Sequence, residues 1–263
     1  MVSHQKIGIS LRQAFGIQPG AVISLVGGGG KTSLMFALAH EIEGAGETVV
    51  TTTTTRIFEP PAGETFLIVE ADEETLFSRL SWAFGKYNHV TLASVRLPGG
   101  KLKGIAPETV DRLAGLKLVS YIVNEADGSA RKPLKAPNAT EPVIPESTTL
   151  VIAVVGIDAL GLPLTEANVF RSEIVSRLTG LEPGSPITED MVATLLTHAE
   201  GIAKGTPAHA GIVPLINKID KMPDLLTAES LAHRILAKGY PGIKRVVLGQ
   251  IKRREPIIKV IGE

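Results

Sequence analysis

The run of four glycines at 27–30 constrains this chain more than any other stretch. It follows an apolar segment, 21–26, that predicts a buried strand, and it precedes a segment with helical apolar spacing that extends to about residue 43. Glycines let a backbone turn with positive φ and approach an anion closely. The N–H groups of such a loop, and of the helix after it, point at phosphate. The sequence therefore predicts a phosphate-binding loop between a strand and a helix.

Lys31 and Thr32 directly follow these glycines and add chemistry to the loop. In a loop of this kind the lysine bridges β- and γ-phosphate oxygens, and the threonine hydroxyl holds Mg²⁺. The residues that we expect to contact the nucleotide here are Gly27, Gly28, Gly29, Gly30, Lys31, Thr32 and Ser33. A flexible glycine linker is the alternative, but a linker would not be flanked by a strand and a helix.

The loop departs from the usual pattern G-x-x-x-x-G-K-[ST], because Leu25 stands at the position of the first glycine. The shorter pattern G-x-x-G-K-T, from Gly27 to Thr32, resembles the loop of Mur-type ligases. With 263 residues, the chain is too short for the further domains of such a ligase, which weakens the case for peptide-ligase chemistry.

Strand-like and helix-like segments alternate along the chain. This predicts an α/β fold of the P-loop NTPase type, with a doubly wound, mostly parallel sheet flanked by helices. We expect a single nucleotide-binding domain over 1–263. The expected strands are 21–26, 49–54, 66–69, 90–93, 119–123, 150–155, 212–216, 245–250 and 257–260. The expected helices are 4–16, the segment from the loop to 43, 72–84, 107–116, 166–179, 188–203 and 225–238, with a turn at 99–101.

The charge balance and the cysteine content limit the classes of partner and of chemistry that we expect for this chain. Lysine plus arginine equals aspartate plus glutamate at 27 each, so no overall field favours a nucleic acid or a membrane surface. Cysteine is absent, which excludes thiol catalysis and zinc–thiolate sites and suits a reducing compartment. No apolar run approaches the ~20 residues of a membrane helix, and the N-terminus lacks a signal-peptide pattern. We expect a cytoplasmic protein.

A run of threonines, 51–55, is followed by Arg56 at the end of the second expected strand. The carboxyl ends of strands face the ligand in a doubly wound sheet. We therefore expect hydroxyls of this run, with Thr54 among them, and the Arg56 guanidinium to lie near the γ-phosphate or Mg²⁺. Threonine is also a good strand former, so a structural role predicts the same letters.

Glu125 and Asp127 stand at the end of another apolar strand, where P-loop enzymes carry their magnesium-side carboxylate. They are two residues apart and share one face of an extended chain. We expect one to hold Mg²⁺ directly or through water and the other to position a nucleophile. The predicted metal site is thus Thr32, Glu125 and Asp127, and the predicted catalytic residues are Lys31, Glu125 and Asp127.

Arg131, Lys132 and Lys135 form a basic run directly after these carboxylates. Their charges suit a phosphate group or an anionic small molecule as second substrate. A solvated basic loop is the alternative.

Asn217, Lys218 and Asp220 form an N-K-x-D pattern directly after a predicted strand. This pattern reads guanine in GTPases. The Asp220 carboxylate would accept the ring N–H and exocyclic amino donors, which adenine does not offer together. Asn217 would bond the base or brace the loop, and the stem of Lys218 would stack over the ring. The alternative is that the lysine and aspartate only start a helix.

Several of these stretches together resemble the YqeC family: 23–34, 51–56, 124–137, 141–145 and 217–220. The most specific part is Glu-Ala-Asp-Gly-Ser-Ala-Arg-Lys-Pro-Leu-Lys-Ala-Pro at 125–137. The resemblance implies an accessory protein for selenium-dependent molybdenum hydroxylases, acting in selenium cofactor biosynthesis. It implies a nucleotide-binding role while a selenium-containing ligand of a molybdenum enzyme is matured or inserted.

Two hypotheses follow. In the first, the protein is an enzyme that binds GTP or ATP with Mg²⁺ and hydrolyses the β–γ bond, or transfers that phosphoryl group, during cofactor maturation. In the second, it is a metallochaperone-like GTPase switch, comparable to nickel-enzyme accessory GTPases. It would dock to a client molybdenum hydroxylase and use hydrolysis as a timer. The short Mur-like loop favours the first, and the N-K-x-D pattern favours the second.

Overall fold

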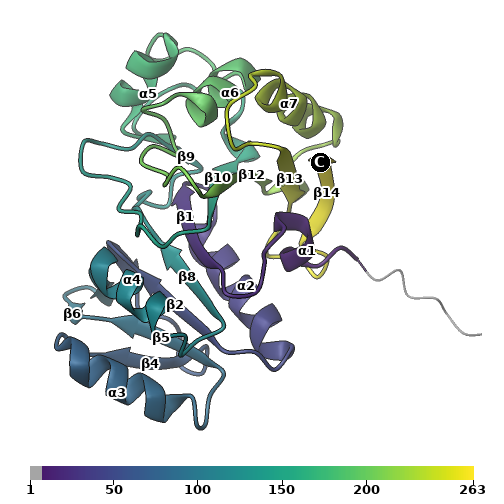
Figure 1. Cartoon of the computed structure of the whole chain (residues 1–263). Coiled ribbons are helices and arrows are strands. Elements are labelled where there is room, and N and C mark those ends of the chain that lie inside the picture. Colours follow the sequence, from purple (N-terminus) through teal and green to yellow (C-terminus); the bar gives the residue numbers. More distant parts are fainter. Residues whose placement is uncertain (1–7) are drawn as a thin grey trace, which may run out of the picture.

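A single large sheet runs through the computed structural model, which describes residues 8–263 (Figure 1). Its strand order is β14-β13-β12-β10-β1-β8-β2-β5-β4, and every pairing is parallel except that of β14 with β13. The strands are β1 (Val22–Gly27), β2 (Val49–Thr53), β4 (Phe66–Val69), β5 (His89–Ala93), β8 (Tyr121–Glu125), β10 (Leu150–Gly156), β12 (Gly211–Asn217), β13 (Arg245–Gly249) and β14 (Ile257–Gly262). The predicted mostly parallel sheet is confirmed.

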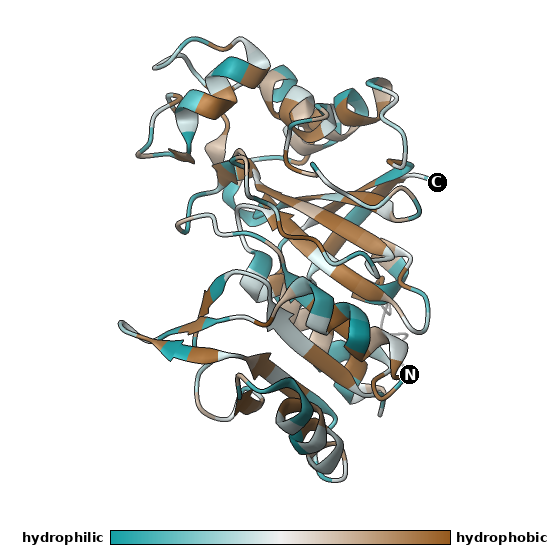
Figure 2. Cartoon of the chain, turned by 60° about the vertical axis from the view of Figure 1, so that its left-hand side comes forward, coloured by the Kyte–Doolittle hydropathy of each residue, from teal (hydrophilic) through white to brown (hydrophobic). Residues whose placement is uncertain are grey.

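Helices cover both faces of this sheet, as Figure 2 shows by the apolar strands between helical layers. The helices are α1 (Leu11–Phe15), α2 (Lys31–Gly44), α3 (Glu73–Ala83), α4 (Pro107–Gly115), α5 (Ser172–Thr179), α6 (Glu189–Thr197) and α7 (Leu226–Ala237). Successive side chains of a strand point to opposite faces. Thus Ile23 and Leu25 pack against α1 and α2, whereas Val22 and Val26 face the layer that holds the other five helices. The α/β prediction is confirmed.

Two small sheets stand apart from the large one. One joins β3 (Arg56–Phe58), β7 (Lys101–Lys103) and β6 (Val95–Leu97) in antiparallel order, and the other pairs β9 (Leu134–Lys135) with β11 (Val169–Phe170). Neither was predicted, because strands of two or three residues leave no periodic pattern. The predicted turn at 99–101 is confirmed in part, since Gly99 and Gly100 separate β6 from β7, which begins at Lys101.

Several predicted helix bounds are wrong. The helix expected over 166–179 begins only at Ser172, because Val169 and Phe170 pair with β9 as a strand. The helix expected over 188–203 ends at Thr197, and turns follow it. The helix expected over 4–16 spans Leu11–Phe15, and its first four positions lie outside the described residues.

The topology gathers the polar strand ends at one edge. β1 lies between β10 and β8, with β2 beyond β8 and β12 beyond β10. All five run in the same direction, so the residues after their carboxyl ends meet along this edge, where ligands bind in open α/β sheets. Within residues 8–263 the structure holds no helix of the length and apolarity needed to cross a membrane.

Candidate functional site

The glycine loop takes a shape that other residues would block. Gly27 and Gly30 have φ of 92° and 131°, in the region that favours glycine. A Cβ at Gly27 would lie 2.3 Å from the carbonyl oxygen of Val154, and one at Gly30 would lie 2.5 Å from Nδ2 of Asn217. The loop is therefore packed tightly against β10 and against the end of β12.

The sequence predicted that the N–H groups of the glycine loop point at phosphate, but three of them are bonded within the protein. The N–H of Gly27 donates to Asp127 Oδ2 (3.0 Å), that of Gly28 to Val154 O (2.9 Å) and that of Gly29 to Lys132 O (3.0 Å). These three N–H groups thus hold the loop rather than face the cavity. The first turn of α2 has no side-chain cap, so the N–H groups at 31–33 are the ones offered to an anion.

Lys31 lies beneath the loop, almost wholly buried, between two carboxylates. Its Nζ donates to Gly27 O at 2.6 Å and lies 3.1 Å from Asp127 Oδ1 and 3.5 Å from Glu125 Oε1. Burial lowers the pKa of Lys31, but the two carboxylates outweigh it, so the pKa lies above its usual value. Lys31 is therefore a fixed positive charge at the start of α2.

Glu125, the last residue of β8, lies beside the first turn of α2. Its Oε2 accepts the hydroxyl hydrogen of Thr32 at 2.7 Å. Burial raises the pKa of Glu125, Asp127 adds to this, and Lys31 and Thr32 offset only part of it. A threonine hydroxyl and a carboxylate side by side are oxygen ligands of the type that Mg²⁺ takes. In donor chemistry, this pair of side chains fits the Mg²⁺ predicted for it.

Asp127 lies deeper, 1% exposed and outside the cavity lining. It accepts from the Gly27 N–H and pairs with both Lys31 and Lys135, the latter at 3.0 Å. These contacts brace the loop and Lys31, whereas the sequence predicted that Asp127 would hold Mg²⁺, directly or through water, or position a nucleophile.

Lys135 differs from its predicted role in the same way. It is fully buried, does not line the cavity, and pairs with Asp127 at 3.0 Å and with Glu141 at 2.8 Å. Glu141 also pairs with Arg171 at 2.6 Å. Burial raises the pKa of Glu141, but Arg171 and Lys135 outweigh it and the pKa lies below the usual value. Lys135 thus belongs to a buried ion-pair chain and cannot face a second substrate.

The threonine run is mostly structural. Thr51 Oγ1 bonds Thr91 Oγ1 at 2.6 Å, Thr52 donates to Leu92 O at 2.9 Å, Thr53 donates to Glu125 O at 2.6 Å and Thr54 donates to Val143 O at 2.6 Å. The prediction that Thr54 lies near the γ-phosphate is therefore not supported, because its hydroxyl faces the 143 segment. Thr55 and Arg56 do line the cavity.

The N-K-x-D residues lie at the other side of the loop. The buried Asn217 amide donates to Gly29 O at 2.9 Å, and its Oδ1 accepts from the Ile251 N–H at 3.1 Å. Lys218 has φ of 67° and pairs with Asp158 at 2.7 Å. Asn217 therefore ties the glycine loop to the segment after β13, which is the second of the two roles predicted for it, bonding the base or bracing the loop.

Asp220 lines the cavity and pairs with the exposed Arg253 at 2.8 Å. One of its oxygens is used by this pair, and the residues Gln250, Ile251 and Lys252 after β13 line the cavity beside it. We call Asn217, Lys218, Asp220, Gln250, Ile251 and Lys252 the Asp220 end of the cavity.

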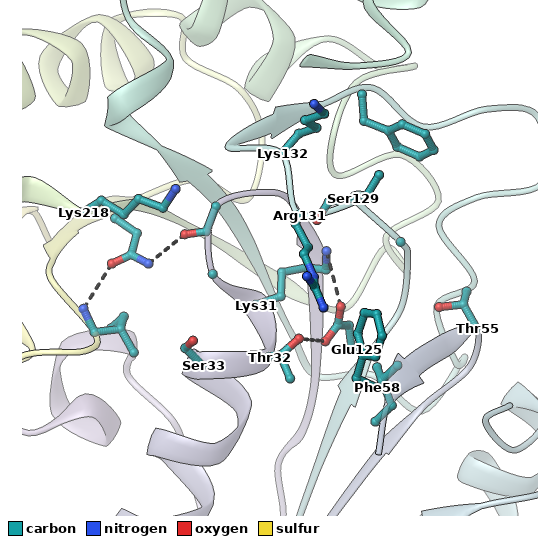
Figure 3. Close-up of a pocket in the computed structure, with 18 of the residues that line it drawn as sticks. Lys31, Thr32, Ser33, Thr55, Phe58, Glu125, Ser129, Arg131, Lys132 and Lys218 are labelled. Atoms are coloured by element: carbon teal, nitrogen blue, oxygen red, sulfur yellow. Dashed lines mark hydrogen bonds and ion pairs between the residues drawn. The ribbon is translucent and has the colours of Figure 1, made fainter. Parts of the chain in front are cut away.

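One cavity of about 1030 Å³ joins these parts (Figure 3). The predicted residues that line it are Gly29, Gly30, Lys31, Thr32, Ser33, Arg56, Glu125, Arg131, Lys132, Asn217, Lys218 and Asp220. Those that do not are Gly27, Gly28, Thr54, Asp127 and Lys135. Segments that are almost 200 residues apart in sequence thus share one site.

The sequence prediction missed several lining residues. Phe58, Lys101 and Lys103 reach the cavity from the small sheet of β3, β7 and β6. The only available signal was the Lys-Leu-Lys alternation after the glycine turn at 99–100, which is typical of a strand with one exposed face.

The comparisons with known proteins agree with one another. A family model described as "YqeC protein" matches residues 23–173, a segment that includes the glycine loop, Glu125 and the basic run. An Escherichia coli (strain K12) protein, named "Uncharacterized protein YqeC", is 31% identical over 242 residues. That match covers 90% of this chain and 90% of the relative.

Proposed function

This chain belongs to the YqeC family, and from that premise we propose that it binds a nucleoside triphosphate with Mg²⁺ and breaks the β–γ bond, by hydrolysis or phosphoryl transfer. We propose that it does so as an accessory protein in the maturation of a selenium-containing molybdenum hydroxylase. The link to selenium and molybdenum rests on the family resemblance, and the geometry of the cavity supports the nucleotide part.

The observation that carries the nucleotide part is the contact of Thr32 Oγ1 with Glu125 Oε2 at 2.7 Å, beside the charged Lys31. A hydroxyl from the helix start and a carboxylate from the neighbouring strand are the two protein ligands expected for Mg²⁺ in P-loop proteins. Thr32 and Glu125 would hold Mg²⁺, which would supply positive charge to neutralise the charge that develops on phosphate oxygens.

The chain's own groups supply the rest of the phosphate site. The uncapped first turn of α2 offers N–H groups to phosphate oxygens, and the helix dipole favours negative charge there. Lys31 stays protonated because Asp127 and Glu125 raise its pKa, so it offers a positive charge to phosphate oxygens. The phosphates would thus lie between the start of α2 and the end of β8.

The Asp220 end of the cavity supports binding of GTP over ATP. Asp220 faces the cavity with a carboxylate, which accepts from the N1–H and amino group of guanine. Adenine presents an acceptor at N1, so the same carboxylate would repel it. Asn217 links this end to the glycine loop through its bond to Gly29 O.

A second candidate function, the metallochaperone-like GTPase switch, is favoured by the same Asn217 bridge. The side chain joins the glycine loop to the segment after β13, so a change at the phosphates could reach the surface near Arg253. In this case the client molybdenum hydroxylase, and not a small molecule, would stimulate turnover.

The experiment is a phosphate-release assay with GTP or ATP and Mg²⁺, run alone, with selenide or a molybdopterin compound, and with a client hydroxylase. Turnover that needs the small molecule supports the enzyme, and stimulation by the client alone supports the switch. Absence of phosphate release from both nucleotides in every arm, or full activity in Lys31→Ala, would contradict the proposed function.

A further inference from the structure

The cavity has a second end that the nucleotide does not explain. It is formed by the exposed face of the small sheet, where Ile57 and Leu102 point into the core and their neighbours point outward. We call Arg56, Phe58, Lys101, Lys103 and Arg131 the basic end; all five line the cavity.

The charges of the basic end are unbalanced. Arg56 and Lys103 are direct cross-strand partners in the pairing of β3 with β7. Like charges in that relation destabilise a sheet. Within residues 8–263, no carboxylate oxygen lies within 4.0 Å of the charged nitrogens of the four basic residues. In a chain with 27 residues of each sign, this concentration calls for an anion from outside.

Phe58 gives this end an apolar surface. Phe58 is 45% exposed, and the Arg131 guanidinium lies 4.4 Å and the Lys101 ammonium 5.3 Å from the centroid of its ring. A guanidinium stacked on a ring keeps its N–H donors in its own plane, where they take an oxyanion in bidentate fashion. The basic end therefore combines oxyanion donors with a ring face.

The Asp220 end and the basic end of the cavity lie on opposite sides of the glycine loop. β12, which leads into the Asp220 end, and β2, which leads into β3 and the basic end, lie on opposite sides of β1 in the sheet. Figure 3 shows Lys218 on one side, Thr32 and Lys31 between, and Phe58 and Thr55 on the other. The cavity volume of about 1030 Å³ lies at the upper limit of the roughly 300–1,000 Å³ usual for one small ligand, which is compatible with a second small molecule beside the nucleotide.

We propose that the basic end binds a small organic phosphate beside the nucleotide, with its phosphate against Arg56, Lys103 and Arg131 and its apolar or aromatic part on Phe58. The inference rests on the proposed function, because the proposed nucleotide fills the Asp220 end and the glycine loop. In this proposal, Arg56 and Lys103 of the small sheet contact the second substrate, in place of the Lys135 contact that the sequence predicted.

The test uses phenyl phosphate as probe and follows the broadening of its proton NMR signals as the full-length protein is added. The protein is first saturated with a non-hydrolysable GTP analogue and Mg²⁺. We expect binding of phenyl phosphate, binding at least about tenfold weaker for inorganic phosphate and for benzyl alcohol, and a loss of about tenfold or more in Arg56→Gln/Lys103→Gln. Lys238→Gln, which changes an exposed lysine directly after α7 and outside the cavity lining, is the matched control and should bind within about twofold of the parent chain.

Thermal melting of the same variants separates binding from folding. Removing two opposed like charges should leave the melting temperature of Arg56→Gln/Lys103→Gln unchanged or higher. No broadening of phenyl phosphate in the parent chain, equal affinity in the double variant, or a melting temperature that falls together with the affinity would overturn the proposal. If the GTP analogue itself does not bind, the proposed function fails, whereas the phenyl phosphate titration of the nucleotide-free protein still tests the basic end.

Discussion

At the scale of residues, the site depends on a buried chain of ion pairs. It runs Lys31, Asp127, Lys135, Glu141 and Arg171, with Glu125 beside Lys31. Buried ions of this kind are tolerated when each is paired, and removal of one partner costs about 3–5 kcal/mol. Three cations meet three carboxylates in this chain of ion pairs, so the chain of ion pairs has no net charge with which to balance an added triphosphate. The affinity for the nucleotide should therefore depend on Mg²⁺.

Asp220 provides a residue-scale prediction about the base. In Asp220→Asn the side chain offers one donor and one acceptor in place of two acceptors. Guanine loses an acceptor for its amino group, whereas xanthine, which has a carbonyl there, gains a donor. We expect GTP affinity to fall about tenfold or more and xanthosine triphosphate affinity to rise, measured by competition against a fluorescent nucleotide.

The control for this exchange is Asp190→Asn, which alters an exposed aspartate that pairs with Arg234 at 2.7 Å on the surface. It should leave both affinities unchanged. An Asp220→Asn protein with the parent preference for GTP over xanthosine triphosphate would remove the guanine assignment.

At the scale of elements, β5 carries a buried histidine at its first residue. His89 is 2% exposed, bonds Thr51 Oγ1 at 3.0 Å, and has its pKa lowered to about 4 by burial, with His40 adding to the effect. The unfolded chain has a histidine pKa of about 6.5 and binds the proton first as pH falls. The folded state is therefore stabilised above pH 6.5 and loses this stability as pH falls toward 4.

We expect the free energy of unfolding of the parent chain to fall by about 2 kcal/mol from this source between pH 7.5 and 5. His89→Gln keeps a polar partner for Thr51 but does not titrate, so its profile should be flatter by that amount in urea titrations. His233→Gln, at an exposed helix position, is the control and should follow the parent chain. EDTA is included because ligand atoms of His40, Glu43 and His89 lie within 4.8 Å of one another. Identical slopes in the His89→Gln and parent chains would contradict the assignment.

Gly104 tests how the small sheet is held. It follows β7, its N–H donates to Thr55 O at 3.1 Å, and a Cβ there would lie 1.5 Å from Thr53 O. Gly104→Ala must push β7 away from the end of β2, at a cost of about 1–3 kcal/mol or more. We expect a lower urea midpoint and weaker phenyl phosphate binding.

The matched control is Gly115→Ala at the end of α4, where no atom lies within 4 Å of the added Cβ. Alanine favours a helix over glycine by about 0.5–1 kcal/mol, so this variant should be as stable as the parent chain or more so. Equal stability of Gly104→Ala and Gly115→Ala would show that the small sheet is not held at this point.

At the scale of the whole molecule, the sequence predicted those structural features that depend on a local sequence pattern. The glycine loop, the apolar β1 and β10, and the alternation of strands with helices all leave a local signal, and so does the polar end of β8 at Glu125. The small sheet left almost none, because β3 and β7 are short and pair across more than 40 residues. Its position, and hence the basic end, is decided by tertiary packing.

Burial of charge was also beyond the sequence. Lys135 and Arg131 stand in one basic run, but Asp127 and Glu141 neutralise the first, and the second is free to stack on Phe58. Likewise Thr54 and Thr55 are neighbours, and only Thr55 reaches the cavity. Which member of a run is functional depends on partners that are distant in sequence.

The central claim is that the cavity binds a nucleoside triphosphate through Lys31 and Mg²⁺. The most direct measurement is calorimetric titration of a non-hydrolysable GTP analogue into the parent chain with Mg²⁺, into the parent chain with EDTA, and into Lys31→Ala whose fold is checked by circular dichroism. We predict saturable binding in the first titration and affinities about tenfold or more lower in the other two. Absence of binding by the parent chain with Mg²⁺, or an unchanged affinity in folded Lys31→Ala, would contradict the account.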